Sequence, residues 1–429
     1  GEAATDTDTI DFTIAGSNDA PVMKNGDDAV SISETDAALT ATGGVSVTDQ
    51  DITDVVTMSW DVSSVEWVSD TESTIYRPEA VPSTTDLKAM FDATLQPIDA
   101  TVSQGDVNWT FNSSSTDFDF LDDGESYVIT YRLTATDADA NATDVTTVTV
   151  TVVGTNDAPV LANETVTVSV TEDASLSGTD LYVTGSTSFT DLDVTDTSDV
   201  TEPRSSLYAN NHGSSAEAMA FSNALNGSDF IIQGAGVGTG VYAHEGTVTW
   251  SFQIDNAVTQ FLGQGEVNRL WYDIEVTDNE GNGVSTSERI YVDVFGANDA
   301  PVITVSEADD SASVTLSETN ATPSSTLSAS DTLSVEDVDI GDEITVSVTA
   351  VTTSGVDAGL LSNNSALLSM LSVDAGAVIS NTDTVGTIAW SFNSGSETFD
   401  HLSDGEQLDL IYTVQASDDS GTVSSTDDI

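Results

Sequence analysis

Short stretches of strictly alternating apolar and polar residues recur three times along the chain. One such stretch runs over Ala29–Glu34, Thr165–Glu172 and Ser313–Glu318, and each copy ends at a glutamate. Successive side chains of a β-strand point to opposite faces, so a period of two predicts a strand with one buried face. The three copies therefore predict equivalent strands in three repeats.

Two further strands are predicted in the second part of each repeat. A Trp-x-Phe segment comes first, and its two rings share one face because they lie two residues apart. A longer segment follows, in which apolar residues alternate with polar ones before an aspartate. We expect these aromatic and apolar residues to form the core of each repeat. They are Trp109, Phe111, Ile129, Tyr131, Leu133 and Ala135, then Trp250, Phe252, Leu270, Tyr272, Ile274 and Val276, then Trp390, Phe392, Leu408, Leu410, Tyr412 and Val414.

The heptapeptides GSNDAPV, GTNDAPV and GANDAPV divide the chain. They begin at Gly16, Gly154 and Gly296, a spacing that matches the length of an ordinary domain. The predicted modules are residues 17–154, 155–296 and 297–429, and residues 1–16 match the last strand of a preceding repeat. The last strand of the third module is incomplete beside the other two, which predicts that the sequence is part of a longer tandem array.

Each module also carries an insert of variable sequence before its Trp-x-Phe segment. The inserts predict short helices that begin near Thr84, Ser215 and Asn364, with Thr85, Ser215 and Asn364 as candidate N-cap residues. Many short strands separated by Gly, Asp and Asn turns predict an all-β fold. We therefore expect tandem antiparallel β-sandwich modules, with short helices in the inserts, in an extended array.

The charge of the chain narrows the range of partners. The sequence contains 73 acidic residues against 7 lysines and arginines, a formal net charge of −66. Such a chain repels nucleic acid and anionic membranes and attracts cations. The absence of cysteine excludes disulfides and thiolate metal sites. No apolar run approaches the roughly 20 residues of a membrane helix, so we expect no membrane insertion, and the amino terminus does not resemble a signal peptide.

A D-x-D-x-x-D motif occurs once in every module. Carboxylates two residues apart in extended backbone project the same way and so converge on one point. Calcium takes six to eight oxygen ligands and tolerates irregular geometry, so this pattern predicts calcium binding. The third aspartate of each motif is either a further ligand or a cap of its own turn. The motifs are Asp49, Asp51 and Asp54, then Asp191, Asp193 and Asp196, then Asp337, Asp339 and Asp342.

The heptapeptide adds oxygen donors at each joint between modules. Its Asn-Asp pairs offer side-chain and carbonyl oxygens, and its proline lacks an N–H that would repel a cation. Proline also biases the preceding alanine to extended geometry, which stiffens the linker. The heptapeptide is thus predicted to be both linker and ligand. The pairs are Asn18 with Asp19, Asn156 with Asp157, and Asn298 with Asp299.

The turns of a β-sandwich lie at its two ends, which decides which acids can meet. The D-x-D motifs and the aspartates Asp137, Asp278 and Asp418 would face the joint before their module. The glutamates Glu34, Glu125, Glu172 and Glu266 would face the joint after it. A joint would then collect oxygens from both neighbours. The alternative is that these acids are ordinary turn residues bonded to their own backbone. Asp122 and Asp123 are interpreted as a solvated turn.

The motifs NDAPV, VTDxD, LDDGE and YxLxAxD, with the early glutamate, resemble those of cadherin-like tandem domains. The bacterial form of these domains is the VCBS-type or extender repeat of giant RTX adhesins. The resemblance covers three repeats and essentially the whole chain. It implies immunoglobulin-like β-sandwiches, calcium ions at every joint, and type I secretion to the bacterial cell surface.

Carried over residue by residue, the resemblance assigns ligands to three joints. The first joint keeps Asn18, Asp19, Asp49, Asp51 and Asp137; the second has Glu34, Glu125, Asn156, Asp157, Asp191, Asp193 and Asp278; the third has Glu172, Glu266, Asn298, Asp299, Asp337, Asp339 and Asp418. The modules are longer than a minimal cadherin-like domain, so their inserts could have a further role.

The leading hypothesis is a calcium-rigidified spacer of a secreted surface adhesin that projects adhesive domains for attachment and biofilm formation. Its partners would be calcium ions and the neighbouring repeats. The alternative is that the inserts bind a carbohydrate or peptide, with Tyr208–Phe221 as the first candidate. Exposed aromatic residues in the inserts would favour binding, and buried ones favour the spacer. An enzyme is the weakest hypothesis, because the three histidines occupy non-equivalent positions and no known catalytic motif occurs.

Overall fold

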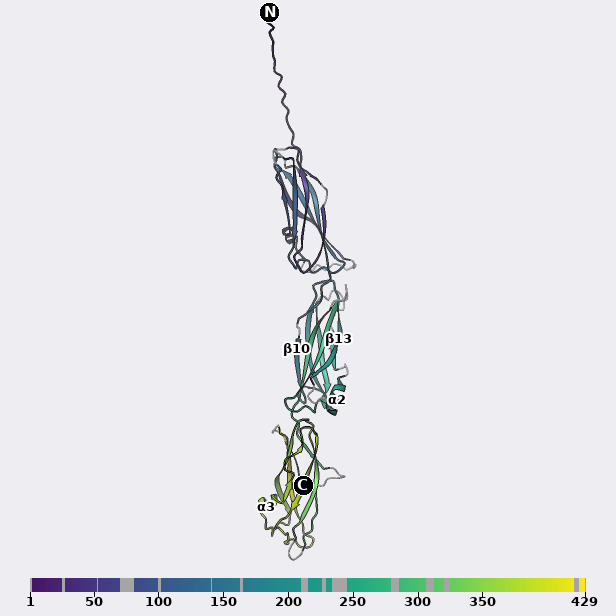
Figure 1. Cartoon of the computed structure of the whole chain (residues 1–429), viewed down its shortest axis with the longest axis vertical. Helices are drawn as coiled ribbons and strands as arrows, with labels where there is room; N and C mark the ends of the chain where they lie inside the picture. The colour runs from purple at the N-terminus through teal and green to yellow at the C-terminus, as the bar shows by residue number, and fades with distance from the viewer. Residues whose placement is uncertain are drawn as a thin grey trace.

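The computed structural model has three elongated modules arranged end to end, with the N-terminal segment extending beyond the first (Figure 1). It describes residues 2–24, 28–51, 53–69, 81–98, 102–139, 141–162, 165–209, 215–225, 229–233, 245–278, 285–305, 312–319, 325–419 and 424–428. The fold is all-β, as the alternating pattern predicts, and every module is a sandwich of two sheets.

The first module packs two four-stranded sheets against each other. One sheet has the order β1-β3-β6-β5, with bounds Val22–Lys24, Thr40–Thr48, Gln104–Asn112 and Phe91–Leu95. The other has the order β2-β8-β7-β4, with bounds Asp28–Ser33, Thr143–Val153, Ser126–Asp137 and Val56–Val68. The Trp-x-Phe segment lies in β6 and the long alternating segment in β7, on facing sheets.

The second module repeats this arrangement. Its first sheet has the order β11-β12-β15-β14, with bounds Leu176–Ser177, Asp180–Thr190, Glu245–Asp255 and Phe230–Gln233, and β9 (Val160–Leu161) also pairs with β12. Its second sheet has the order β10-β17-β16-β13, with bounds Thr165–Thr171, Ser285–Phe295, Val267–Asp278 and Ser198–Ala209. A short 3₁₀ turn, η1 (Asn256–Val258), follows β15.

The third module keeps the first sheet and changes the edge of the second. The first has the order β18-β19-β23-β21, with bounds Val302–Thr304, Ser328–Glu336, Val385–Asn393 and Leu371–Val373. The second has the order β22-β20-β24-β25, with bounds Ala377–Ile379, Ile344–Gly355, Leu408–Ser417 and Ser424–Asp428. The predicted strand over Ser313–Glu318 is wrong, because these residues are not in a strand.

The pairing of the edge strands explains this difference. In the first two modules the edge strand pairs in parallel with the last strand, as β2 does with β8 and β10 with β17. The sandwich is therefore not purely antiparallel. In the third module β25 pairs only with Thr413–Ser417 of β24. Among the described residues Ser313–Glu318 pairs with no strand, although it lines one hollow together with Leu408–Tyr412 of β24. Leu408 and Leu410 are accordingly only half-buried.

The predicted helices occur in all three inserts and begin at or next to the predicted residues, but two N-cap residues lie one or two positions earlier than predicted. They are α1 (Thr84–Ala89), α2 (Ala216–Ala224) and α3 (Asn364–Leu368). Ser215 caps α2 as predicted. The N-cap residues of α1 and α3 are Ser83 and Asn363 rather than Thr85 and Asn364, because these extended residues accept the backbone N–H of Asp86 and Ala366.

The core of each module contains the predicted aromatic residues and is tied to the insert by a tyrosine. Tyr131 donates its hydroxyl to the carbonyl of Leu87 in α1, at 2.7 Å, and Tyr412 donates to Leu367 in α3, at 2.9 Å. In the second module Tyr272 donates instead to the Asp229 carboxylate. Since a buried hydroxyl needs a partner, each tyrosine fixes its insert over the sandwich.

Residues 2–21 form no strand. Their alternating residues Ile10, Phe12 and Ile14 are exposed, and the proposal that residues 1–16 complete a preceding repeat stays a prediction. Across the described residues, we find no helix with the length and apolarity needed to cross a membrane.

Replacing Trp250 by Ala should destabilise the middle module whether or not calcium is present. Trp250 is 2 % exposed, stacks on Phe230 at a centroid distance of 5.2 Å, and covers Gly185, where a Cβ atom would lie 2.2 Å from its ring. Removing such a side chain costs about 3–5 kcal/mol. Limited proteolysis with mass spectrometry should map new cleavages to residues 155–296.

The matched control is Tyr182→Ala, which truncates an aromatic residue of the same module that is 36 % exposed. Its proteolysis should resemble that of the unmodified chain. Equal protection of the Trp250→Ala and Tyr182→Ala variants would contradict the assignment of Trp250 to the core.

Candidate metal centres at the module joints

The second and third joints each begin with a glycine that packs directly on the preceding module, whereas Gly16 of the first joint has no atom of another residue close to its Cβ position. Gly154 donates its N–H to the carbonyl of Glu125, and Gly296 donates to that of Glu266, both at 3.0 Å. A Cβ atom at Gly154 would lie 2.3 Å from the carbonyl oxygen of Asp122, and one at Gly296 would lie 2.1 Å from that of Leu262. Only glycine permits this approach, which explains the first residue of the heptapeptide.

The D-x-D motif of the following module accepts a hydrogen bond from the backbone of the linker. At the second joint the Asp157 N–H donates to Asp193, and the Asp193 N–H donates to Asp191 at 3.3 Å. At the third joint the Asp299 N–H donates to Asp339 at 2.8 Å. The first joint has the equivalent bond from Asp19 to Asp51, at 2.5 Å. One carboxylate oxygen per aspartate thus orders the loop, and the other is left for a ligand.

The aspartate at the end of the long strand reaches the same place. Asn156 donates its side-chain amide to Asp278 at 3.2 Å, and Asn298 donates to Asp418 at 3.1 Å. These bonds orient each asparagine so that its own oxygen points away from the aspartate. The structure therefore brings the D-x-D motif, the Asn-Asp pair and the strand-end aspartate together, as the sequence predicts.

Glutamates of the preceding module lie on the other side of the linker at each of these joints. Glu34 accepts the Thr155 hydroxyl at 2.5 Å, and Glu172 accepts the Ala297 N–H at 2.6 Å. Glu125 is buried and accepts the indole N–H of Trp67 at 3.1 Å. Glu266 differs, since it is half-buried and accepts the N–H of Gly263 in its own turn, at 3.3 Å.

In the part of the chain that the structure describes, three groups of carboxylates have ligand atoms within 4.8 Å of one another. Two lie at the second joint and one at the third, and each joins acids that are distant in sequence. They are Asp122 with Asp193 and Asp196, Asp191 with Asp196 and Asp278, and Glu172 with Asp299 and Asp339. At the first joint Asp49, Asp54 and Asp137 are buried, but Asn18 and Asp19 are exposed, and no such group occurs among the described residues there.

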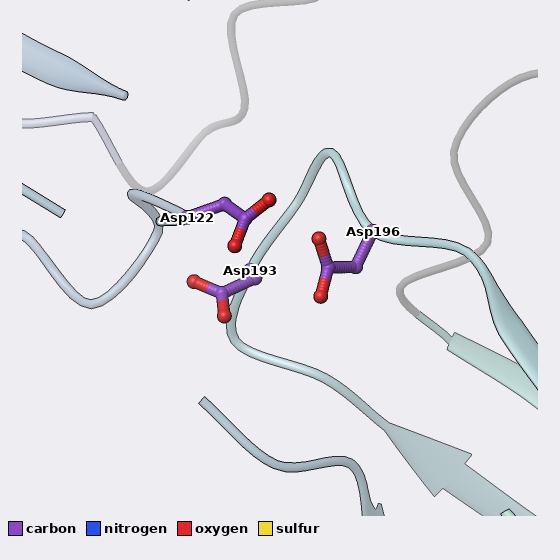
Figure 2. Close-up of side chains that lie close together, drawn as sticks. All are labelled: Asp122, Asp193 and Asp196. Atoms are coloured by element: carbon purple, nitrogen blue, oxygen red, sulfur yellow. The ribbon is translucent and has the colours of Figure 1, made fainter. Parts of the chain in front are cut away.

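Asp122 is a candidate that the sequence interpretation missed. Figure 2 shows its carboxylate turned toward those of Asp193 and Asp196 across the second joint. It is 6 % exposed, whereas Asp123 is exposed as expected. The interpretation of this pair as a solvated turn is therefore wrong for Asp122. No signal in the sequence separates Asp122 from Asp123, because the burial of Asp122 depends on the module that follows.

Many buried oxygens of these side chains have no hydrogen-bond partner among the described residues. At the second joint they belong to Glu34, Glu125, Asn156, Asp157, Asp191, Asp193, Asp196 and Asp278, and at the third to Glu172, Asn298, Asp299, Asp337, Asp339 and Asp342. Burying unpaired carboxylates is costly, and a bound cation removes that cost. The donor set is all oxygen, which fits a hard divalent cation such as calcium.

Burial also makes these carboxylates hard to ionise without a cation. Desolvation, followed by the nearby charge of Asp157, raises the pKa of Asp193 to about 9. Desolvation raises the pKa of Glu172 and of Asp339 to about 8, with Asp299 adding to both. The pKa of Asp196 is raised by burial and by Asp122. Ionising these carboxyl groups therefore costs free energy, and a bound divalent ion would lower that cost.

Neither a family model nor a curated protein matches the chain. Solved structures do resemble it. The crystal structure of human CDH23 EC21-23 has 14 % identity and a TM-score of 0.37, with 96 % of this chain and 99 % of that chain covered. Extracellular cadherin domains 3-6 of protocadherin gamma B2 have 16 % identity and a TM-score of 0.36, covering 95 % and 71 %. Titin domains I67-I69 have 10 % identity and a TM-score of 0.23, covering 95 % and 96 %.

These similar structures are tandems of cadherin domains or immunoglobulin-like domains. Their identities and TM-scores are too low to assign this chain to a family. The fold class follows from the strand pairing of the chain itself.

Without calcium, the chain should become less stable as the pH rises from about 5 to about 9. The pKa values of Asp193, Glu172 and Asp339 in the folded chain, about 9, 8 and 8, exceed the value near ~4 of an unfolded carboxyl group. The folded state therefore holds protons that the unfolded state has released, so its stability falls as pH rises through this window. Thermal melts in chelator should show a falling Tm.

In calcium the trend should be weaker or reversed, because the ligands must be deprotonated to bind the ion. Asp193→Asn should flatten the slope in chelator, whereas Asp123→Asn, at an exposed position, should leave it unchanged. A Tm that rises with pH in chelator would contradict the burial of ionisable carboxyl groups at the joints.

Proposed function

We propose that the chain is a run of spacer repeats that calcium stiffens by bridging adjacent modules. The observation that carries this proposal is the set of buried, unpartnered oxygens at the second and third joints. Each set comes from two modules and from the linker between them. A cation bound there would join three parts of the chain that otherwise repel one another, so it would fix the angle between modules.

The second joint would use Glu34, Glu125 and Asp122 of the first module, the Asn156-Asp157 pair of the linker, and four aspartates of the second module. The four are Asp191, Asp193, Asp196 and Asp278. Calcium would supply positive charge there and be held through oxygen. The third joint would use the corresponding side chains Glu172, Glu266, Asn298, Asp299, Asp337, Asp339, Asp342 and Asp418. The first joint would need an upstream module to complete the set of Asn18, Asp19, Asp49, Asp51, Asp54 and Asp137.

Apolar contacts at the same joints would reinforce the ion. Val194, inside the D-x-D-x-x-D loop, packs against the core of the first module. Ile340, at the equivalent position, belongs to the core cluster of the second module and donates its N–H to the carbonyl of Phe261 at 3.1 Å. These contacts can form only when the loop lies close to the preceding module. Relief of repulsion by calcium would therefore promote apolar docking of one module on the next.

We infer from the motif resemblance that the chain belongs to a secreted bacterial surface adhesin of the RTX or VCBS-repeat kind. In that role the array would hold adhesive domains away from the cell for surface attachment and biofilm formation. The strong acidity supports this setting, because cations reduce the self-repulsion of a chain with this charge. We propose no catalytic role for it.

Ligand binding by the inserts remains the second candidate. In the described part of the second insert, Phe221 is buried and contacts Phe261 at a centroid distance of 6.1 Å. Leu87 and Leu367 of the other inserts are buried as well. Buried apolar residues support the spacer, although the side chain of Tyr208 and residues 210–214 lie outside the described part of the chain.

Replacing Asp191 and Asp193 by Asn should change stability with opposite sign in chelator and in calcium. The amide oxygens keep the hydrogen bonds from Asp157 and Asp193, but two charges are lost. In chelator the variant should melt at the same or a higher temperature than the unmodified chain. In calcium at about 100 times its Kd, the unmodified chain gains roughly 2.7 kcal/mol per site, and the variant should lose that gain at the second joint.

The matched control replaces Asp199 by Asn and Glu245 by Gln, two exposed acids of the same module. It removes two charges and should respond to calcium as the unmodified chain does. Magnesium at the same concentration should stabilise less, because it demands tight octahedral geometry. A loss of equal size in both buffers would show that Asp191 and Asp193 are only turn residues.

A further inference from the structure

The second and third joints differ in the turn that the preceding module contributes to each of them. The turn before β7 has the sequence FLDDGE and the turn before β16 has FLGQGE. Both turns hold the linker glycine through the carbonyl of their glutamate, and both place the third residue of the motif against that glycine. The third residue is Asp122 at the second joint and Gly263 at the third. One joint therefore has a carboxylate where the other has none.

At the second joint this carboxylate faces an acid that has no partner. Asp196 is 0 % exposed, and neither of its carboxylate oxygens has a hydrogen-bond partner among the residues that the structure describes. Asp122 and Asp193 lie with it in one group of ligand atoms within 4.8 Å (Figure 2). Asp122 also accepts the Asp123 N–H at 2.5 Å, which fixes its rotamer toward the group. The three carboxylates come from both sides of the joint.

The equivalent place at the third joint is open to a side chain. An ideal Cβ atom on Gly263 would lie 3.5 Å from Oδ1 of Asp342 and 3.7 Å from Cβ of Asp339. These are ordinary van der Waals distances. Asp342 and Asp339 are the counterparts of Asp196 and Asp193, and a buried oxygen of each has no partner. A carboxylate at position 263 would lie near Asp339 and Asp342, as Asp122 lies near Asp193 and Asp196. Because residue 263 is a glycine, the third joint lacks this carboxylate.

We propose that Asp122 completes a cation-binding position that only the second of these two joints has, so that the second joint is ordered at a lower calcium concentration than the third. This inference rests on the proposed calcium function and adds an order of events to it. Calcium affinity rises with the number of charged ligands in a site. As the calcium concentration rises, the joint between modules one and two would become rigid first. The joint between modules two and three would become rigid at a higher concentration.

Reciprocal variants test this inference in the full chain. Asp122→Asn should lower the number of calcium ions bound per chain, or raise the half-saturating concentration of that site roughly tenfold. Gly263→Asp should have the opposite effect. The matched controls are Asp123→Asn and Gln264→Asp, which make the same charge changes at the adjacent exposed residues and should leave binding unchanged. Equilibrium dialysis against calcium measures the ions bound.

Trp67 reports the joint at which the change occurs. Its indole N–H donates to Glu125 at 3.1 Å, so its fluorescence should change when calcium fills the second joint. A Trp67→Phe variant identifies this signal among those of the other tryptophans. The midpoint of the Trp67 signal should shift upward in Asp122→Asn and stay in place in Gly263→Asp.

Two results would overturn the inference in different ways. If the unmodified chain binds no calcium, the inference and the proposed function both fall. If the chain binds calcium but Asp122→Asn binds as Asp123→Asn does, the inference alone is wrong. Should Gly263→Asp fail to fold, the comparison of the two Asn variants still decides the outcome.

Discussion

The repulsion among buried carboxylates is the constraint on which the arrangement of this chain depends. The second and third joints each bring acids from two modules and a linker into a space with little solvent, where their charges are screened weakly. Such an arrangement costs free energy unless a cation or protons neutralise it. Each sandwich also has a hydrophobic core of its own, which offsets this cost. On the proposed function, the joints would respond to the ionic environment while the cores hold the modules folded.

A few local contacts position the linker and the acidic residues at each of these two joints. A glycine lets the linker lie against the turn of the preceding module, and a D-x-D loop holds the linker by backbone hydrogen bonds. An apolar residue inside that loop, Val194 or Ile340, reaches the core of the preceding module. The same few residues thus set the reach of the linker, the position of the acids and the apolar contact. A change at any of them would alter the angle between two modules.

Much of this organisation could be predicted from the sequence, because repetition places equivalent residues in register. The alternating pattern of Ile129, Tyr131 and Leu133 predicts a buried face, and these residues are buried. The pattern was misleading at Ser313–Glu318, since an edge strand forms only where its backbone pairs with a neighbouring strand. Asp122 was missed because turn sequences such as LDDGE do not show which side chain will be covered by the next module. Burial at an interface depends on the neighbour, and only the structure shows it.

The most direct test of the account is small-angle X-ray scattering of the full chain at fixed ionic strength, in calcium and in chelator. If calcium fixes the joints, the maximum dimension should increase in calcium, and the pair-distance distribution should become that of a rod. In chelator the chain should scatter as modules connected by variable angles. Equal dimensions and equal distributions in the two buffers would contradict the claim that calcium stiffens this array.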